Sequence, residues 1–240
     1  MPLGLPDLAS RSALLQELLE RVREVAGQIN RAGWAEANAG NISINITDIA
    51  TPVYPYGKEG EQVRWYIVSR TGSRYRDLAR YPLPHLLLIS LSDGAETVYP
   101  PDANPTSEWT CHRLLQQRLN NARSDCRVVL HAHPDSVILL SQLDIYKQPV
   151  LLNKALRKAL PEFALYLPEG VATAQYAPPG SQELANCSLD AIGNARALIW
   201  QGHGLLTLAP DCDLALDLMQ VAEKAARLLL ERFRLTKNWL

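Results

Sequence analysis

The sequence has few cysteines, and none of them are spaced as a Cys-x-x-Cys pair. The four are Cys111, Cys126, Cys187 and Cys212. Without that spacing the chain lacks the usual pattern of a zinc knuckle, and four scattered cysteines do not make a disulfide framework. We therefore expect reduced thiols in a cytoplasmic protein.

Long hydrophobic runs and an excess of one charge are also absent. Apolar runs such as Leu86–Leu91 are far shorter than the roughly 20 residues that a membrane-spanning helix needs. The segment Met1–Asp7 has neither the basic nor the apolar region of a secretory leader. The net charge of -1 gives no electrostatic reason to bind nucleic acid or an anionic membrane. We expect a cytoplasmic location, with no membrane segment and no nucleic-acid partner.

The chain is long enough for a sizeable core, and it has no internal repeat or clear linker. Its 240 residues, 47% of them hydrophobic, are therefore expected to form a single α/β domain over residues 1–240. Apolar spacings of three and four predict helices, and short apolar or alternating runs predict strands. We expect helices at Ser12–Ala32, from Pro105–Glu108 onward, and at Asp135–Leu143, Leu151–Leu160, Gln182–Asn194 and Asp213–Leu235. We expect strands at Ile42–Ile46, Trp65–Ser69, Leu86–Leu91, Glu96–Tyr99, Arg127–Leu130, Leu165–Leu167, Val171–Gln175, Ala197–Trp200 and Leu205–Leu208.

Histidine is scarce, and three of the five histidines follow predicted strands. His131 and His133 stand two residues apart after one strand, so they point to the same side and both can reach one ion. His203 follows another strand in the segment Gly202-His-Gly204. A lone His-x-His pattern fits two hydrogen-bonded core histidines equally well. Three histidines with the carboxylate of Glu108 instead suit a catalytic Zn²⁺ ion.

Three short polar segments could bind an anion. Asn38-Ala-Gly-Asn41 and Thr71-Gly72 are turn-like, with backbone amides close together. In Pro105-Thr-Ser-Glu108, Thr106 or Ser107 could cap the next helix, with Glu108 in its first turn. Ordinary turns and an ordinary helix cap would explain all three segments. The alternative is a phosphate held by hydroxyl and amide groups, with Glu108 directed at the metal.

Together these segments resemble the class II, zinc-dependent aldolase/adducin family. The resemblance covers nearly the whole chain, in the family's order and approximate spacing. It implies a three-layer α/β/α fold with a central, mostly antiparallel sheet flanked by helices. The motifs that carry it are Asn38–Ser43, Thr71-Gly72, Pro105–Glu108, His131–Pro134 and Gly202–Gly204.

The resemblance also implies roles for individual residues. Zn²⁺ would be held by three histidines, and Glu108 would be the fourth ligand at rest and the catalytic base. Glu162 would act near the aldehyde end of the substrate, from a neighbouring subunit of a homotetramer with active sites between subunits. Asn38 would contact the substrate's oxygens. The metal ligands would be His131, His133 and His203, and the phosphate site would be formed by Gly40, Asn41, Thr71, Gly72, Thr106 and Ser107.

Within the family the chain most resembles the enzymes that cleave L-rhamnulose 1-phosphate. The segments Gly33–Asn41 and Arg76–Pro82, and Glu162 after Pro161, carry this likeness. The implied reaction is a lyase step of rhamnose metabolism. It gives dihydroxyacetone phosphate and L-lactaldehyde through a metal-stabilised enediolate. The sequence departs from the family at Ala39, where glycine is usual, and at its shorter C-terminal end.

Other reactions on the same fold stay open. They are cleavage of L-fuculose 1-phosphate, dehydration of methylthioribulose 1-phosphate and 4-epimerisation of a ribulose phosphate. The epimerase would be expected to carry aspartate in place of Glu108. An adducin-like interaction module without chemistry is the most remote alternative, because such modules have lost the metal histidines that this chain keeps.

Overall fold

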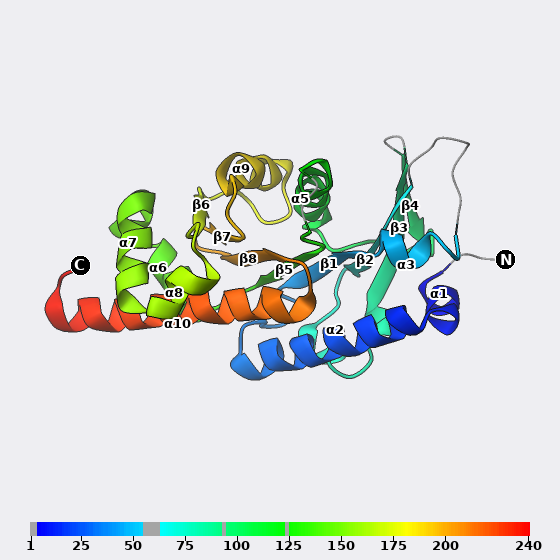
Figure 1. Ribbon diagram of the computed structural model, residues 1–240, viewed down its shortest axis with the longest axis horizontal. Helices are drawn as coiled ribbons and strands as arrows, with labels where there is room; N and C mark the ends of the chain where they lie inside the picture. The colour runs from blue at the N-terminus through cyan, green and yellow to red at the C-terminus, as the bar shows by residue number, and fades with distance from the viewer. Residues whose placement is uncertain (1–3, 55–62, 93–94, 123–124) are drawn as a thin grey trace. The chain divides into compact units, whose positions relative to one another are not determined.

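The computed structural model describes residues 4–54, 63–92, 95–122 and 125–240. By its internal contacts the chain divides into two compact units, Met1–Trp109 and Thr110–Leu240. Each unit contains four of the described strands together with its own helices (Figure 1). Residues 1–3, which belong to the segment without leader features, lie outside the described residues. Among the residues that are described, no helix is long and apolar enough to cross a membrane.

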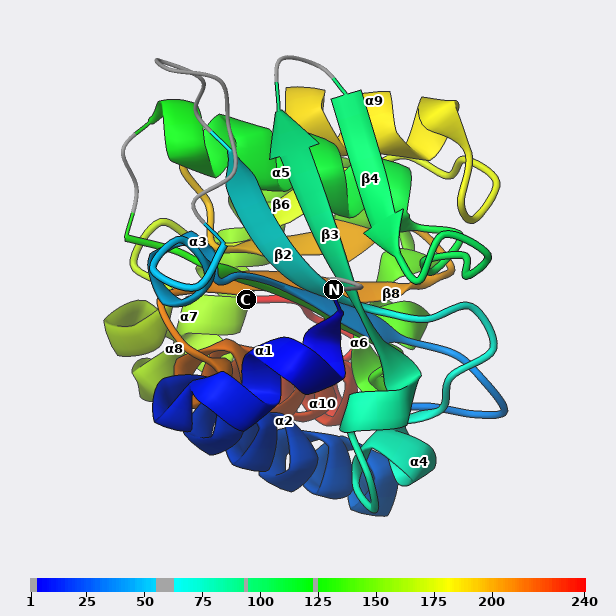
Figure 2. The same ribbon diagram turned by 90° about the vertical axis from the view of Figure 1, so that its right-hand side faces the viewer.

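The sheet of the first unit is antiparallel throughout, in the order β4-β3-β2-β1. Figure 2 shows β2, β3 and β4 side by side, with α1 and α2 on one side of them. Apolar residues pair across the sheet, with Ile44 opposite Ile67 and Ile67 opposite Leu88. The four strands predicted for this region are confirmed. They are β1 (Asn41–Asn45), β2 (Arg64–Ser69), β3 (Leu86–Ser92) and β4 (Ala95–Tyr99).

The long helix of the first unit follows from its sequence pattern and from caps at both ends. The side chain of Ser12 accepts a hydrogen bond from the backbone N–H of Leu15 at 3.2 Å. Gly33 closes the helix with a φ of 77°, a conformation that glycine adopts at little cost. The helices of this unit are α1 (Leu5–Arg11), α2 (Ala13–Ala32), α3 (Thr47–Ala50) and α4 (Tyr75–Leu78), with a 3₁₀ turn η1 (Leu83–His85).

The sheet of the second unit has the order β5-β8-β7-β6. Its pairings are antiparallel except for β6 with β7, which is parallel. The predicted strand before His131 extends through Ala132, so the first histidine lies within the strand. The strands are β5 (Val128–Ala132), β6 (Ala172–Ala174), β7 (Ala197–Trp200) and β8 (Gly204–Ala209).

Helices cover both faces of this second sheet. Residues of α5 and α9, such as Leu115 and Ala185, share one apolar core with Leu198 and Leu206 of the strands. On the other face, α10 packs against α6, α7, α8 and the strands β5 and β8 (Figure 1). The expected α/β class with a mostly antiparallel sheet is confirmed, and this unit has the expected three layers. The helices are α5 (Trp109–Asn121), α6 (Asp135–Ser141), α7 (Pro149–Ala159), α8 (Pro161–Tyr166), α9 (Gln182–Ile192) and α10 (Cys212–Thr236), with a 3₁₀ turn η2 (Asp144–Lys147).

Two local predictions were wrong. Leu165–Leu167 was expected to be a strand, but residues up to Tyr166 belong to α8. Pro161 both ends α7 and starts α8, because proline is tolerated in the first turn of a helix. The helix expected from Pro105–Glu108 begins only at Trp109, so Glu108 precedes the helix instead of lying in its first turn.

All four cysteines are free thiols, as expected. Three of them are buried, and Cys187 is partly exposed. Burial raises the pKa of Cys212 to about 12, and the nearby carboxylates of Asp213 and Asp211 add to this effect. This thiol therefore stays protonated at neutral pH and behaves as a core side chain.

Candidate functional site

The first unit brings together two of the predicted phosphate-binding segments. The backbone N–H of Thr106 donates to the carbonyl of Ser69 at 2.8 Å, and that of Thr71 donates to Asn104 at 2.9 Å. The hydroxyl of Thr71 also donates to the carbonyl of Pro105. These bonds hold the turn after β2 against the segment that leads into α5.

Hydroxyl and amide groups of this cluster differ in their access to solvent. Thr71, Gly72 and Ser107 are exposed, whereas Thr106 is buried. Gly72 has a φ of 78°, which favours glycine and allows a tight turn after the strand. An exposed tight turn beside an exposed serine is suited to binding an anion such as phosphate.

Glu108 is buried and is held by Asn41. Nδ2 of Asn41 donates to Oε2 of Glu108 at 2.7 Å, and both residues are 5% exposed. The hydroxyl of Tyr75 in turn donates to the carbonyl of Asn41 at 2.9 Å. Within the described residues, Oδ1 of Asn41 is buried without a hydrogen-bond partner. The Asn41 amide therefore positions the carboxylate, a contact that the sequence did not reveal.

The loop before β1 has an unusual backbone. Ala37 has a φ of 49° and Gly40 a φ of 75°. The N–H of Ala39 donates to the carbonyl of Glu36 at 2.8 Å and closes a turn, and Asn38 is exposed on it. A non-glycine residue in the left-handed region costs about 1 kcal/mol, and such residues are concentrated at functional sites.

The second unit brings the three predicted metal ligands together. One candidate ligand atom from each of His131, His133 and His203 lies within 4.8 Å of the other two. The ring centroids are 4.9–5.1 Å apart. His131 is fully buried, and the other two are partly exposed. The expected clustering of these three histidines is therefore confirmed.

The hydrogen-bond partner of His131 indicates the tautomer of its neutral ring. Nδ1 of His131 lies 3.0 Å from the carbonyl oxygen of Leu205. A carbonyl only accepts, so Nδ1 carries the hydrogen and Nε2 of the neutral ring has a lone pair. A hydrogen bond on the far nitrogen fixes a metal-ligating imidazole in the same way.

Two residues to which the sequence analysis gave no role of their own, Trp200 and Gly204, shape the space around the triad. Trp200 stacks on His203 at 5.0 Å, and its ring lies 4.5 Å from that of His131. Gly204 lies under the other rings. A Cβ atom there would come within 2.6 Å of the Ala132 carbonyl oxygen and within 3 Å of atoms of His131 and His133. Glycine is therefore required by close packing, a reason that only the folded chain reveals.

The donor set fits a divalent transition metal. Three imidazole nitrogens are typical ligands of Zn²⁺, and the hydrogen bond at Nδ1 of His131 makes Nε2 the nitrogen of that ring that would bind the ion. Nε2 of His131, Nε2 of His133 and Nδ1 of His203 are shielded from solvent. A set of three protein ligands leaves coordination positions for a substrate or a further ligand.

Glu162 lies elsewhere in the second unit. It is exposed on α8 and lines a cleft of about 290 Å³, which none of the three histidines lines. Asp217 of α10 lies in the same cleft, and burial, with Asp213 and Asp211 nearby, raises its pKa. The second unit alone therefore does not bring Glu162 to the triad, and its catalytic role stays a prediction.

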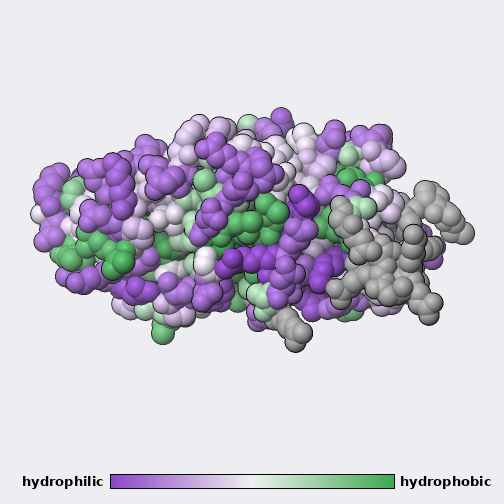
Figure 3. Space-filling view, turned by 90° about the horizontal axis from the view of Figure 1, so that it is seen from above, coloured by the Kyte–Doolittle hydropathy of each residue, from purple (hydrophilic) through white to green (hydrophobic). Residues whose placement is uncertain are grey.

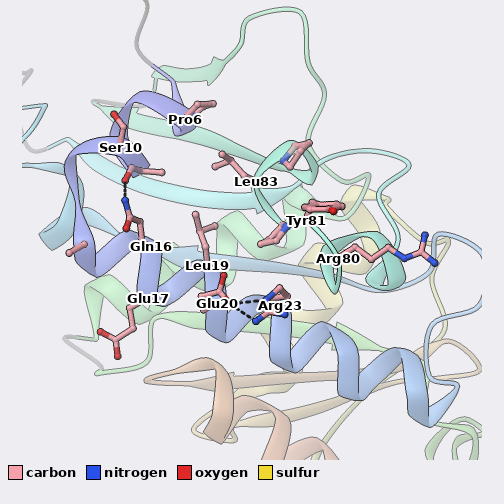
Figure 4. Close-up of a pocket in the computed structure, with 14 residues that line it drawn as sticks. Pro6, Ser10, Gln16, Glu17, Leu19, Glu20, Arg23, Arg80, Tyr81 and Leu83 are labelled. Carbon is pink, nitrogen blue, oxygen red and sulfur yellow. Dashed lines mark hydrogen bonds and ion pairs between the residues drawn. The ribbon is translucent and has the colours of Figure 1, made fainter.

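A larger groove in the first unit has a different lining. It has a volume of about 990 Å³ and lies between α1, α2 and residues 80–84. Figure 4 shows Leu19 of α2 and Leu83 of the facing segment pointing into the same space, with the ion pair between Glu20 and Arg23 at its edge. No predicted site residue lines this groove.

Comparison with known proteins identifies the family. The family model described as Class II Aldolase and Adducin N-terminal domain matches residues 20–230. The chain belongs to the class II aldolase and adducin family. The clustering of His131, His133 and His203 is consistent with a divalent metal, which is typical of class II aldolases.

Relatives in this family extend over most of the chain. A rhamnulose-1-phosphate aldolase from Bacteroides thetaiotaomicron is 29% identical over 234 residues, covering 91% of this chain and 87% of that protein. A rhamnulose-1-phosphate aldolase from Escherichia coli is 24% identical over 221 residues, covering 84% of this chain and 80% of that protein.

Solved structures share the class II aldolase fold. A sugar-phosphate aldolase from Thermotoga maritima gives a TM-score of 0.80 at 24% identity, covering 94% of this chain and 99% of that one. An L-fuculose-1-phosphate aldolase from Thermus thermophilus gives a TM-score of 0.62 at 23% identity, covering 92% of this chain and 95% of that one. At these identities the likeness shows the fold alone.

Proposed function

We propose that this chain is a metal-dependent aldolase that cleaves L-rhamnulose 1-phosphate to dihydroxyacetone phosphate and L-lactaldehyde. The observation that carries the proposal is the triad of His131, His133 and His203, with candidate ligand atoms within 4.8 Å of one another, in a class II aldolase chain. The choice of sugar rests on the relatives named rhamnulose-1-phosphate aldolase, at 21–29% identity.

In this proposal the three histidines hold Zn²⁺. The ion would supply Lewis acidity to the carbonyl group of the substrate. The bond between carbons 3 and 4 breaks, the hydroxyl on carbon 4 becomes the aldehyde and gives up its proton, and carbon 3 gains a proton. Glu108 is the base that carries the proton at carbon 3, and the Asn41 amide keeps its carboxylate oriented.

The phosphate would be bound by the polar cluster of the first unit. Thr71, Gly72 and Ser107 are exposed there, which suits contact with a ligand. Phosphate binding far from the bond that breaks supplies energy that positions the reacting carbons. The residues assigned to it are Gly40, Asn41, Thr71, Gly72, Thr106 and Ser107, and Asn38 is assigned to the substrate's oxygens.

Glu162 is assigned to the aldehyde end of the substrate, acting from a neighbouring subunit of a homotetramer. Two exposed apolar residues lie near it in sequence, with Leu165 of α8 77% exposed and Val150 of α7 87% exposed. Figure 3 shows some apolar surface on the side where both α7 and the C-terminal part of α10 lie in Figure 1. Large apolar side chains that are this strongly exposed are candidates for burial by a partner, which supports an interface that includes α7 and α8.

The test is release of dihydroxyacetone phosphate by the zinc-loaded protein. L-Rhamnulose 1-phosphate, L-fuculose 1-phosphate and L-ribulose 5-phosphate would be offered separately in a coupled assay. The proposal expects release from the first, and expects Glu108→Gln to abolish it while zinc stays bound. No release from the first sugar, or an active Gln variant, would contradict the proposal or the role of Glu108 respectively. Release from the fucose sugar alone would reassign the substrate.

A further inference from the structure

Helix α6 connects two of the three histidine segments. It begins at Asp135, directly after the sequence His133-Pro134, and ends at Ser141. Pro134 occupies the N-cap position of this helix, and its side chain accepts no hydrogen bond from the backbone amides of the first turn. The first amides of a helix have no partner within the helix, so α6 needs an acceptor from elsewhere.

Glu223 of α10 supplies that acceptor. Its Oε1 accepts from the N–H of Ser136 at 3.3 Å, and its Oε2 accepts from the N–H of Val137 at 3.1 Å. Glu223 is only 8% exposed. A carboxylate at a helix N-terminus is favoured both by the two amides and by the helix dipole. The start of α6, just beyond His133, is therefore fixed to the long closing helix.

The other end of α6 is fixed to the segment that carries His203. The hydroxyl of Ser141 accepts from the N–H of Gly202 at 2.8 Å and donates to the carbonyl of Ile138 at 2.7 Å. Ser141 is fully buried, and Gly202 directly precedes His203 with a φ of 67°. The single hydroxyl thus joins the last turn of α6 to the turn that presents the third histidine.

We infer that α6 acts as a spacer that sets the positions of His133 and His203, with Glu223 and Ser141 as positioning residues for the metal centre. The inference rests on the proposed metal site, and it adds two residues that act through α6 and the turn at Gly202. Both contacts join residues that are far apart in the sequence: Ser141 and Gly202 are 61 positions apart, and Ser136 and Glu223 are 87 positions apart. Removing a hydrogen bond to the ligands themselves typically changes metal affinity by about 10–100-fold, and contacts that fix the segments carrying two ligands are expected to act at the lower end of that range.

The test compares metal affinity with stability in matched variants. Ser141→Ala and Glu223→Gln remove bonds at the two ends of α6. Ser181→Ala and Asp211→Ala remove the caps of α9 and α10, which accept from Leu184 at 3.0 Å and from Leu214 at 2.7 Å. The dissociation constant for zinc would be measured by chelator competition, the absorption spectrum would be recorded with Co²⁺, and unfolding by urea would be followed without metal.

We expect the two α6 variants to bind zinc at least roughly tenfold more weakly and to alter the Co²⁺ spectrum. The two control variants should lose comparable stability and keep the zinc affinity of the wild type. Glu223→Asp, which keeps a carboxylate, should bind zinc more tightly than Glu223→Gln. If the Gln variant folds poorly, the Asp variant takes its place in the comparison with the wild type.

Two results would overturn the inference, and they differ. Unchanged zinc affinity in both Ser141→Ala and Glu223→Gln, with a wild type that binds zinc, would refute the spacer role alone. A wild-type protein that binds neither zinc nor Co²⁺ would refute the proposed function and the spacer role together.

Discussion

Gly204 shows how closely the residues under the histidine triad are packed. An alanine Cβ there would lie 2.8 Å from Cε1 of His131, 2.9 Å from Cδ2 of His133 and 2.6 Å from the carbonyl oxygen of Ala132, so the two rings or the backbone beneath them must shift. We predict that Gly204→Ala weakens zinc binding by roughly tenfold or more, because ligands must be held close to their coordination geometry. Competition with a chromophoric chelator measures this.

Gly27→Ala is the control for that substitution. A Cβ at Gly27 would come no closer than 3.3 Å to the flexible end of Arg31. The control should keep the zinc affinity of the wild type and be slightly more stable, because alanine favours a helix over glycine. Equal zinc affinity in Gly204→Ala and the wild type would show that the triad tolerates the shift.

Asn41 gives a second prediction at the scale of a residue. In Asn41→Asp the side chain keeps its shape, but a carboxylate then faces the carboxylate of Glu108 where the 2.7 Å hydrogen bond was. Like charges at this distance repel, so Glu108 should turn away. We expect kcat to fall by at least roughly tenfold, a part of what general base catalysis contributes.

The matched control for this change is Asn186→Asp on the surface of α9. There the side-chain oxygen accepts from Gln182 at 2.9 Å, and an aspartate can still accept. Zinc content should be equal in both variants and in the wild type. An Asn41→Asp enzyme with full kcat would mean that the bond to Glu108 does not serve catalysis.

At the scale of elements, helix caps decide where the helices begin. Ser12 caps α2 by accepting from Leu15, and its loss leaves that amide without its partner. We predict that Ser12→Ala lowers the free energy of unfolding by about 1 kcal/mol, as measured by urea denaturation. Ser10→Ala is the control, since the Ser10 hydroxyl only donates to the Asp7 carbonyl and should cost less. Equal losses in both variants would contradict a capping role for Ser12.

The elements that were predicted correctly carry their signals locally. Helix α2 has an apolar stripe between a serine cap and a terminal glycine, and β7 is a short apolar run with the bounds predicted, Ala197–Trp200. Such patterns depend on nearby residues only, so they can be found in the sequence.

The elements that were missed or misplaced depend on tertiary contacts or on proline. Leu165–Leu167 was expected to be a strand because it is a short apolar run, but its first two residues belong to α8. Periodicity alone cannot separate a helix from a strand over so few residues. Helix α5 begins late because Thr106 pairs with Ser69 of the neighbouring strand. That backbone pairing holds residues before Trp109 out of the helix.

The residues of the site also divide into those that the sequence could predict and those that it could not. The triad could be predicted because His131 and His133 stand two residues apart at the end of one strand and His203 follows another strand. The contacts of Glu223 with α6 could not be predicted, because the partners of Glu223 lie 86 and 87 positions away in the sequence. Glutamate is also common on exposed helix surfaces, so its presence in α10 gave no signal. The bond from Asn41 to Glu108 spans 67 positions and was equally hidden.

At the scale of the whole molecule, the assembly is open to direct measurement. Exposed Val150 and Leu165 on α7 and α8 support a partner surface, and the proposed assembly is a homotetramer. Light scattering coupled to size-exclusion chromatography should give four times the 26.7 kDa of one chain. Val150→Glu should lower that mass, because a charge buried in an apolar interface is costly, whereas Arg21→Glu at an exposed position of α2 in the first unit should not. A monomer at micromolar concentration would contradict the proposal that Glu162 acts from a neighbouring subunit.

The most direct test of the proposed chemistry is removal and return of the metal. Release of dihydroxyacetone phosphate from L-rhamnulose 1-phosphate would be measured on the purified protein, after complete chelation, and after addition of Zn²⁺, in the wild type and in His131→Ala. We predict that chelation abolishes turnover in the wild type, that zinc restores it, and that zinc restores nothing in the variant. Undiminished turnover by the metal-free wild type would contradict a catalytic metal at His131, His133 and His203.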